Sequence, residues 1–423
     1  MLPPSLYADT ATPRLETPPL EGTARASVCV IGSGYTGLSA ALHLAEAGTD
    51  VIVLDAEEPG WGASGRNGGQ VNPGLKYDPD QVEADFGAEM GGRMVALSYG
   101  APDALFDLIE RHQIQCEARQ EGTIRAGIGA TNAATIAVTA EQCIRRGWPV
   151  AMMDAAGAAA LTGTDRYAGA MLDRRGGDLQ PLSYARGLAR AAMQLGARIH
   201  GQTPAVSLAR AQGGWRVATP KGEVLAEQVV LATNGYTGDL WPGLRRSVVP
   251  VYSSIACTAP LRGEIARGVM PQRASLYEAG HITVYYRMDQ SNRLLMGGRG
   301  PQSALTSLEP IRYLMDYAAR LWPGLEGVEW THGWNGQIAA TKDHYPHLHE
   351  PAPGLLAGLG YNGRGVAMGT AMGRQIALRL QGRPAAELDM PVLPIRPIPF
   401  HGFWKLGVAW AILQGRLRDR LDS

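Results

Sequence analysis

Two glycine-rich runs near the N-terminus have residue types and spacing suited to binding a dinucleotide. The first extends from Gly32 to Gly37, the second is Gly62–Gln70, and the acidic Asp55 lies between them. In the first run, Gly32 permits a tight turn, Gly34 lets backbone N–H groups approach a pyrophosphate, and Gly37 lets a helix pack on a strand. The N-terminus of that helix attracts the anion, and Asp55 can accept hydrogen bonds from ribose hydroxyls of an adenosine. We therefore predict a dinucleotide site in this part of the chain.

The segments around the first run have the order of a βαβ unit. A strand is expected over 27–31, a helix over 37–47 and a second strand over 50–54, so the glycine turn joins a strand to a helix. The order of strand, glycine turn and helix returns in residues 355–380. A NAD-linked dehydrogenase is disfavoured, because the second run and this C-terminal turn have no role in such an enzyme.

Length and composition indicate a well-buried globular enzyme with two domains. The 423 residues exceed a single ordinary core, 45% of them are hydrophobic and 18% are charged. The formal net charge is zero, which removes the bulk electrostatic argument for nucleic acid as a partner. The four cysteines show neither metal-ligand spacing nor a disulfide framework. The sequence has no apolar signal core and no run long enough to span a membrane, so we expect a cytoplasmic protein.

The rest of the chain alternates between helical and strand patterns. Helices are expected over 77–111, 131–146, 181–195 and 311–321. Strands are expected over 122–126, 205–209, 215–219 and 228–232, with a β-rich stretch over 248–298.

Several motifs in a fixed order resemble the glycine-oxidase and sarcosine-oxidase class of FAD-dependent amine oxidoreductases, within the D-amino-acid-oxidase superfamily. Besides the two N-terminal glycine runs, they are Leu231–Asn234, Tyr286–Gly298 and the stretch from Trp334 to Val366. The resemblance covers about residues 26–420, and the γ-glutamylputrescine-oxidoreductase-like branch is the most similar.

The resemblance implies an α/β fold combined with an α+β part. A discontinuous, Rossmann-like FAD-binding domain of the glutathione-reductase type is accompanied by a second domain that is built on an antiparallel sheet and covers the flavin. The FAD domain is expected in residues 22–75, 177–245 and 335–395. The substrate domain is expected in residues 76–176 and 246–334, and a C-terminal amphipathic tail in residues 396–423.

The resemblance also implies which residues hold the FAD. Gly62–Gln70 would run beside the isoalloxazine and the pyrophosphate, and the backbone of Val206 would meet the adenine. The helix after Gly363 would face flavin N1 and O2, where negative charge accumulates on reduction, although a purely structural turn is the alternative there. The predicted cofactor-binding residues are Gly32, Ser33, Gly34, Tyr35, Thr36, Gly37, Asp55, Ala56, Gly62, Ala63, Ser64, Arg66, Asn67, Gly68, Gly69, Gln70, Val206, Thr233, Asn234, Gly235, Gly360, Asn362, Gly363, Arg364, Gly365 and Val366.

We expect the FAD to be bound noncovalently. Some relatives attach it through a cysteine seven residues before the aspartate that matches Asp343, and here Gly336 takes that place. No cysteine lies close in sequence, and Gly62–Gln70 contains no histidine.

The implied reaction is the oxidation of a C–N bond in an amine or amino acid. The amine loses a proton, hydride passes from its α-carbon to flavin N5, and the resulting imine hydrolyses to a carbonyl compound and an amine or ammonia. No acid/base residue is predicted, because the site need only orient the neutral amine. The candidates for the substrate face are Tyr285, Tyr286, Arg287, Trp334 and Tyr361.

Each of these candidates has a structural alternative. The aromatic rings could form a cradle for a cationic amine or could pack in the core. Strand alternation allows only one of Tyr285 and Tyr286 to point inward. Arg287 could bind a substrate carboxylate or form a structural salt bridge.

A cluster of histidines raises the possibility of a metal site. The run His344-x-x-His347-x-His349 is accompanied by His281 and His332, but Pro346 interrupts it and its spacing is not helical. We therefore expect a loop of surface histidines and no bound metal.

The electron acceptor is left open between O₂, which would give H₂O₂, and a quinone or protein partner. O₂ is the first expectation. However, some oxidases of the superfamily carry an oxygen-activating lysine where this chain has Leu295, and Lys342 is the only other lysine in a flavin-side motif. The tail from Phe400 to Arg418 could lie in a membrane interface and meet a quinone, or dock as a helix on the protein itself. A flavin-holding subunit without turnover of its own is the alternative from a different class.

Overall fold

The computed structural model describes residues 2–280 and 283–422, except for the side chains of Leu413 and of residues 416–422. His281, which we considered as a metal ligand, lies outside the described residues. The same holds for the side chains of Arg416 and Arg418 in the tail.

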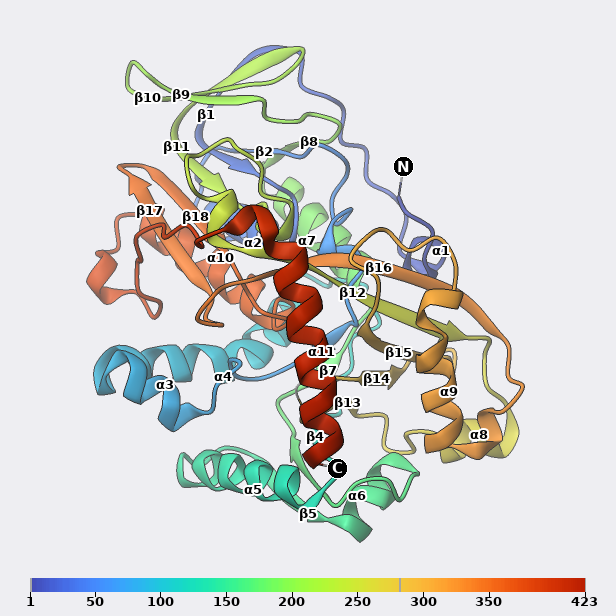
Figure 1. Cartoon of the computed structure of the whole chain (residues 1–423). Helices are drawn as coiled ribbons and strands as arrows, with labels where there is room; N and C mark the ends of the chain where they lie inside the picture. The colour runs from blue at the N-terminus through green and yellow to red at the C-terminus, as the bar shows by residue number, and fades with distance from the viewer. Residues whose placement is uncertain (1, 281–282, 423) are drawn as a thin grey trace.

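The first of two large sheets carries the N-terminal βαβ unit (Figure 1). Its strand order is β17-β18-β11-β1-β2-β8, and β10 and β9 extend it from β11. The pairs that join β18, β11, β1, β2 and β8 are parallel. The strands are β1 (Gly22–Ile31), β2 (Val51–Leu54), β8 (Arg198–His200), β9 (Ser207–Ala211), β10 (Gly214–Ala218), β11 (Gly222–Leu231), β17 (His347–Ala352) and β18 (Leu355–Leu359).

Helices cover this sheet and bury its apolar strands. Every residue of β2 and β18 is buried, as expected for parallel strands that are covered on both faces. The covering helices are α2 (Tyr35–Glu46), α7 (Pro181–Gln194) and α10 (Ala367–Leu380), and α4 (Ala88–Arg111) packs on α10. A Cβ atom at Gly373 of α10 would lie 2.6 Å from the Ser39 Cβ of α2, so this glycine allows the two helices to cross closely.

The second sheet is antiparallel except where β13 pairs with β4. Its order is β16-β12-β15-β14-β13-β4-β6-β5. Its strands are β4 (Thr123–Gly127), β5 (Val150–Asp154), β6 (Gly169–Asp173), β12 (Val249–Thr258), β13 (Ser275–Glu278), β14 (Tyr285–Met288), β15 (Leu294–Arg299) and β16 (Trp330–Ala340). The helices α5 (Ala130–Arg145), α6 (Ala155–Thr162), α8 (Gly263–Gly268) and α9 (Arg312–Leu321) lie around it (Figure 1). The predicted fold class, a Rossmann-like domain with a second antiparallel-sheet domain, is confirmed.

A short two-stranded sheet, β3 (Gln70–Val71) with β7 (Gly177–Asp178), connects the two parts. The side-chain amide of Gln70 donates to the carbonyl oxygens of Leu276 and Tyr286, at 2.7 and 3.1 Å, on two strands of the second sheet. The second glycine run is therefore anchored directly to the antiparallel sheet.

Several predicted elements differ from the observed ones. The helix expected over 77–111 is two helices, α3 (Pro79–Phe86) and α4, because Gly87 between them has φ +79°. The strands β5 and β6, the helix α6 and the short α1 (Leu6–Thr10) were not predicted from the sequence. The domain bounds remain a prediction, and the boundary expected between residues 334 and 335 falls inside β16.

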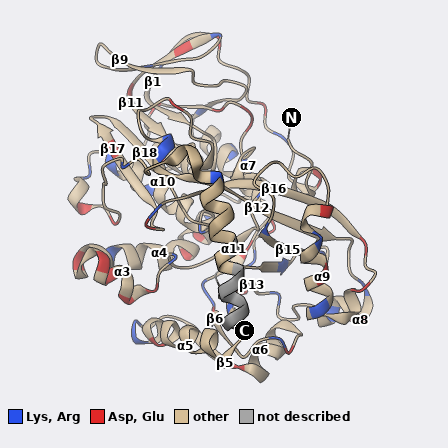
Figure 2. Ribbon diagram, in the orientation of Figure 1, with Lys and Arg blue, Asp and Glu red and all other residues tan. Residues whose placement is uncertain are grey.

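The C-terminal tail contains a long helix, α11 (Trp404–Asp422). Large apolar side chains on and just before it are exposed, namely Phe400, Phe403, Leu406 and Trp410. None of the helices in the described part of the chain is long and apolar enough to cross a membrane. Figure 2 shows acidic and basic residues spread over many outer elements, in keeping with the zero net charge. Where the tail binds remains a prediction.

Candidate active site

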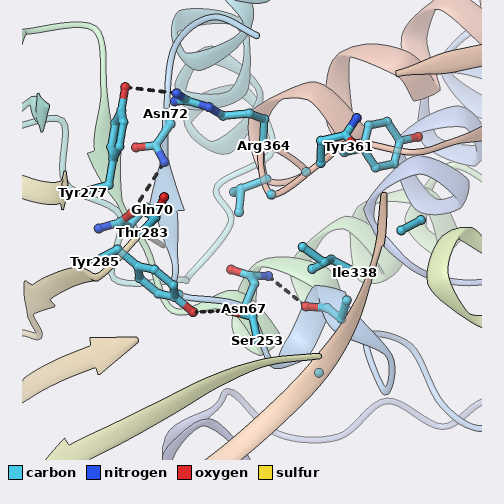
Figure 3. Close-up of a pocket in the computed structure, with 18 of the residues that line it drawn as sticks. Asn67, Gln70, Asn72, Ser253, Tyr277, Thr283, Tyr285, Ile338, Tyr361 and Arg364 are labelled. Carbon is cyan, nitrogen blue, oxygen red and sulfur yellow. Dashed lines mark hydrogen bonds between the residues drawn. The ribbon is translucent and has the colours of Figure 1, made fainter. Parts of the chain in front are cut away.

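A cavity lies between the two parts of the molecule and is lined by residues of both (Figure 3). One wall consists of backbone-rich turns at 34–36, 63–70 and 361–366. The opposite wall consists of side chains from the antiparallel sheet, including Ser253, Tyr277 and Tyr285. The cavity therefore brings together segments that are more than 300 residues apart in the sequence.

The first glycine turn has no room for side chains. Gly32 has φ +107°, and a Cβ atom at Gly37 would lie 1.9 Å from the carbonyl oxygen of Gly32. At Gly34 a Cβ atom would lie 2.9 Å from Ser64 Oγ, which also accepts a hydrogen bond from the Tyr35 N–H at 3.0 Å. The N-terminus of α2 consequently opens on the cavity, where its N–H groups and dipole suit a phosphate.

Asp55 directly follows β2 and closes the first glycine turn. Its Oδ2 accepts hydrogen bonds from the Ser33 N–H and hydroxyl, both at 2.6 Å, and its Oδ1 accepts one from the Glu57 N–H at 2.9 Å. Burial raises the pKa of Asp55, and the hydrogen bonds from Ser33 oppose that rise. Because a carboxylate offers about four lone-pair positions, Asp55 can still accept from a ribose hydroxyl, and this contact remains a prediction.

The polar side chains of the second glycine run bond mainly within the protein. Asn67 accepts from the Gly69 N–H at 2.8 Å and donates to the Tyr35 hydroxyl at 3.1 Å. Arg66 donates to the Tyr236 hydroxyl at 2.6 Å, and its guanidinium lies 4.7 Å from the centre of the Trp61 ring. Asn67 and Arg66 both line the cavity, and their hydrogen bonds hold the turn in shape. Direct donation from either side chain to a cofactor remains a prediction.

The C-terminal turn presents a second helix start to the same cavity. Gly360 and Gly363 have φ +81° and +89°, and a Cβ atom at Gly363 would meet nothing within 4 Å. The Gly360 N–H donates to Asn234 Oδ1 at 3.0 Å, which links the predicted 233–235 segment to this turn. Tyr361, whose pKa is raised by burial, shares a 2.6 Å hydrogen bond with Thr36 Oγ1. The starts of α2 and α10 are therefore held together.

These turns fit a dinucleotide. Residues at the N-termini of α2 and α10 line one cavity, which places two positive helix ends along its wall. Where the glycines leave space, backbone atoms can approach a ligand closely, as a pyrophosphate and a flavin edge require. Gly336, at the position where some relatives carry a linking cysteine, also lines the cavity. The four cysteines are buried elsewhere, so noncovalent attachment remains our proposal.

The predicted adenine contact at the Val206 backbone remains a prediction, although its N–H is already bonded. The backbone N–H of Val206 donates to the Ala218 carbonyl at 2.8 Å in the pairing of β9 with β10, so it is not available to an adenine ring. The Val206 side chain is exposed.

The alternation predicted for Tyr285 and Tyr286 is observed. Tyr285 faces the cavity, and its hydroxyl lies 3.0 Å from Ser253 Oγ (Figure 3). Its ring occupies space that Gly68 and Gly297 leave open, since Cβ atoms there would lie 2.6 and 2.1 Å from it. Tyr286 points into the core of the second sheet, where its hydroxyl lies 2.5 Å from that of Tyr167. Tyr286 is therefore not a substrate-face residue.

Arg287 and Trp334 also belong to the buried framework and not to the substrate face. Arg287 is 3% exposed, forms a 3.1 Å ion pair with Asp178 and donates to the Gly68 carbonyl at 2.8 Å. The Trp334 indole N–H donates to the Arg66 carbonyl at 3.1 Å, and the ring packs edge-on against Tyr7. The structural salt bridge is thus the correct alternative for Arg287, and core packing is correct for Trp334.

The expectation of a surface histidine loop is partly wrong. His347 and His349 lie in strand β17, and His349 has no exposed surface. Burial lowers the pKa of His349 to about 4, and its Nδ1 bonds the Leu393 carbonyl at 2.7 Å. No cluster of three metal-ligating side chains occurs among the described residues. The pairing of β17 with β18, which local spacing does not reveal, explains the burial.

Several side chains that line the cavity were not predicted from the sequence. They come from separate elements and share no local motif: Asn72, Lys76, Arg125, Ser253, Tyr277 and Arg299. Buried Asn72 has an Oδ1 atom without a hydrogen-bond partner in the described part of the structure. Arg364, predicted for the cofactor, donates to the Tyr277 hydroxyl at 3.0 Å and lies over the Tyr277 ring (Figure 3).

A model of the family described as FAD dependent oxidoreductase matches residues 27–379 of this chain. The chain belongs to that family. It is similar to gamma-glutamylputrescine oxidoreductase of Escherichia coli (strain K12), with 32% identity over 98% of both chains. It is also 25% identical to glycine oxidase of Bacillus licheniformis, over 85% of this chain and 94% of that one. Both the predicted superfamily and the predicted branch are confirmed.

Solved structures agree in fold. Glycine oxidase from Geobacillus kaustophilus matches with a TM-score of 0.72 at 23% identity, covering 86% of this chain and 96% of that chain. L-amino acid deaminase from Proteus myxofaciens, in complex with anthranilate, matches with a TM-score of 0.74 at 18% identity, covering 92% and 96%. The chain is thus an FAD-dependent oxidoreductase of the class that acts on amines or amino acids.

Proposed function

We propose that this enzyme oxidises the C–N bond of an amine or amino acid to an imine, which water then hydrolyses to a carbonyl compound and an amine or ammonia. The proposal rests on one observation: the starts of α2 and α10 line a cavity whose other wall is the side-chain face of the antiparallel sheet. The FAD, when bound, supplies the acceptor for the hydride, at its N5 atom. The relatives' names, gamma-glutamylputrescine oxidoreductase and glycine oxidase, support an amine as the substrate.

The residues of this chain would bind and orient the two reactants. The glycine turns hold the cofactor through backbone groups, which leaves the opposite wall for the substrate. Tyr285 offers a ring and a hydroxyl there, fixed by Ser253 and packed into the space over Gly68. Burial raises the pKa of Tyr285, so it stays protonated near neutral pH and orients the substrate without acting as a base.

We propose O₂ as the acceptor that reoxidises the enzyme, with a quinone- or protein-linked dehydrogenase as the alternative. Leu295 is buried in a small apolar cluster. Among the described cavity-lining residues, the lysine is Lys76 and not Lys342. The two acceptors are separated by following the return of the flavin colour after reduction. Reoxidation by dissolved O₂ with formation of H₂O₂ supports an oxidase, whereas reoxidation only by a soluble quinone supports a dehydrogenase.

Anaerobic mixing of the FAD-loaded protein with an amine panel tests the proposed reaction. The panel contains γ-glutamylputrescine, N-methylglycine, glycine and D-amino acids, and the readout is flavin absorbance near 450 nm. Bleaching by at least one compound, with a stoichiometric carbonyl product, is the expected result. A stable flavin that no amine bleaches would instead favour a flavin-holding subunit without turnover.

A further inference from the structure

Residues 2–21 form an N-terminal arm that precedes β1 and the segment 27–379 matched by the family model. The arm contains the short helix α1, which lies beside β16 of the antiparallel sheet (Figure 1). Farther along the arm, the Thr12 N–H donates to Ser183 Oγ on α7 at 3.0 Å. The arm therefore contacts elements of both parts of the molecule.

Tyr7 is the most buried side chain of α1. It is 1% exposed and belongs to a small core that also contains Leu6, Leu295 and Trp334. Tyr285, which faces the cavity, packs against this core. Tyr7 itself is not among the described residues that line the cavity, so it could act on the site only through its neighbours.

The first of these neighbours is Arg287. Its Nη2 donates to the Tyr7 hydroxyl at 3.3 Å, and its Nε donates to the Gly68 carbonyl at 2.8 Å. A Cβ atom at Gly69 would lie 2.8 Å from Arg287 Nη2, so the second glycine run leaves room for this guanidinium. Burial raises the pKa of Tyr7, which keeps its side chain a neutral hydroxyl. One guanidinium thus joins the arm to the backbone of the glycine run.

The second neighbour is Trp334. Its ring centre lies 5.0 Å from that of Tyr7, and the two rings meet edge to face at 70°. The indole N–H of Trp334 donates to the Arg66 carbonyl at 3.1 Å. The two side chains in contact with Tyr7 therefore bond two carbonyls of the second glycine run, at Arg66 and Gly68.

The backbone that these bonds hold is part of the cavity wall. Residues 66–68 line the cavity, and a Cβ atom at Gly68 would lie 2.6 Å from the ring of Tyr285. Because the backbone and the ring are in close contact, a shift of one must displace the other. The packing of Tyr7 is thus coupled to the glycine-turn wall and to the sheet-domain wall.

We propose that Tyr7 is a positioning residue of the cofactor site and that, through Arg287 and Trp334, it fixes the backbone of residues 66–68 against the FAD. The proposal rests on the predicted contact of the second glycine run with the FAD. It deepens the proposed function by giving the N-terminal arm a part in the same site. The alternative is that Tyr7 only fills a core position and has no influence on the cofactor.

Tyr7→Phe and Tyr7→Leu separate the two contacts. Phe keeps the ring and removes the hydroxyl, whereas Leu keeps an apolar side chain and removes both. The FAD dissociation constant is measured from the flavin fluorescence released when the FAD-loaded protein is diluted. We expect it to rise about threefold in Tyr7→Phe and about 30-fold in Tyr7→Leu.

The visible circular dichroism of the bound flavin is the second readout, recorded with FAD in excess so that every site is filled. It reports the surroundings of the flavin and not the stability of the chain. We expect an altered spectrum in Tyr7→Leu and a spectrum close to that of the wild type in Tyr7→Phe, because the ring still supports Trp334.

Tyr345→Phe and Tyr345→Leu are the matched controls. Tyr345 is 4% exposed, its hydroxyl donates to Asp85 Oδ2 at 2.6 Å, and it is not among the described residues that line the cavity. These variants should lower the unfolding temperature by amounts similar to those of the Tyr7 variants. Their FAD dissociation constant and visible circular dichroism should equal those of the wild type.

A double-mutant cycle with Arg287→Lys tests the route through Arg287. Lysine keeps a cation beside Asp178 but lacks the fork that bonds Gly68 and Tyr7 together. In this background Tyr7→Phe should change the FAD dissociation constant by less than about 1.5-fold, because the partner of the hydroxyl is already gone. A full threefold effect there would contradict the proposed route.

The proposal is overturned if Tyr7→Leu unfolds at a lower temperature but binds FAD with the affinity and the spectrum of the wild type. If Tyr7→Leu does not fold, Tyr7→Phe decides, and an unchanged FAD dissociation constant in that variant overturns the proposal. Neither readout requires turnover. If no amine bleaches the flavin, the proposed function fails, while the effect of Tyr7 on the FAD is still measured.

Discussion

The two walls of the cavity are constructed in different ways. The glycine-turn wall uses backbone: positive φ at Gly32, Gly360 and Gly363 and close contacts that exclude a Cβ atom at Gly37. The sheet-domain wall uses side chains from the ends of separate strands and loops, such as Tyr285 and Arg299. A backbone site holds a constant cofactor, whereas a side-chain site can change with the substrate. Substitutions should therefore affect FAD retention on one wall and substrate preference on the other.

The largest effect is expected where the backbone wall is tightest. In Gly37→Ala the new Cβ atom would lie 1.9 Å from the Gly32 carbonyl oxygen, so either α2 or the turn must move. We expect the purified variant to contain far less than one FAD per chain and to unfold at a lower temperature. The ratio of flavin to protein absorbance measures the FAD content, and a thermal melt measures the unfolding temperature.

Gly100→Ala is the matched control for that change. Gly100 is exposed within α4, and a Cβ atom there meets nothing within 4 Å. Alanine should stabilise the helix by about 1 kcal/mol and leave FAD content unchanged. A Gly37→Ala protein that retained FAD as fully as this control would contradict the backbone account of the first wall.

The next largest effect concerns a residue behind the second wall. Arg287→Gln removes one of two arginines that pair with buried Asp178, while Arg119 stays 2.8 Å from that carboxylate, so we expect a loss of about 3 kcal/mol in the free energy of unfolding. Urea denaturation of the FAD-loaded protein measures it. Arg245→Gln removes an exposed pair with Asp239 and should change stability by less than about 1 kcal/mol. If the Arg287→Gln variant had normal stability and a greatly raised KM, the result would show that Arg287 contacts the substrate.

A pH-dependent effect is expected at a residue outside both walls. Because the folded-state pKa of His349 is about 4, the unfolded chain takes up this proton first as the pH falls. Stability is lost from about pH 6.5 downward and levels off below pH 4, by about 3 kcal/mol in total.

His349→Asn tests this pH dependence, since its amide can still donate to the Leu393 carbonyl that Nδ1 bonds. The pH dependence of unfolding in the variant should lack the His349 component, and FAD content should be unaffected. Identical slopes for variant and wild type between pH 4 and 6.5 would show that His349 is not buried in its neutral form.

The smallest effect is expected where one hydrogen bond joins the two glycine turns. Tyr361→Phe removes the 2.6 Å bond to Thr36 at a cost of about 1 kcal/mol. If that bond aligns the starts of α2 and α10, the FAD dissociation constant should rise about fivefold, as flavin fluorescence can measure. An unchanged constant would mean that each turn holds the cofactor independently.

The difference between the walls also explains what the sequence could predict. The roles of Gly32, Gly34 and Gly37 could be predicted, because a tight turn and closely packed backbone segments accept only glycine at such positions. The alternation of Tyr285 and Tyr286 was predictable for a similar reason, because strand geometry fixes which side chains share a face.

Contacts between distant segments were not readable from local patterns. Arg287 meets Asp178 across more than 100 residues, and nothing in its neighbourhood signals that partner. Lys76 and Arg299 are likewise unremarkable in sequence, and only the packing of a loop against a strand end brings them to one cavity. The prediction of one long helix over 77–111 was wrong at Gly87. The apolar pattern continues through this residue, but its positive φ ends one helix before the next begins.

The central claim is that FAD and substrate share this cavity from opposite walls. It is tested most directly by the flavin absorbance spectrum of the FAD-loaded protein during an anaerobic titration with tert-butylamine, which has no hydrogen on its α-carbon and cannot be oxidised. A ligand held on the sheet-domain wall should perturb the flavin bands saturably in the wild type, and with much weaker affinity in Tyr285→Ala at unchanged FAD content. A spectrum that stays constant while calorimetry shows tert-butylamine binding would place the amine away from the flavin and contradict the account.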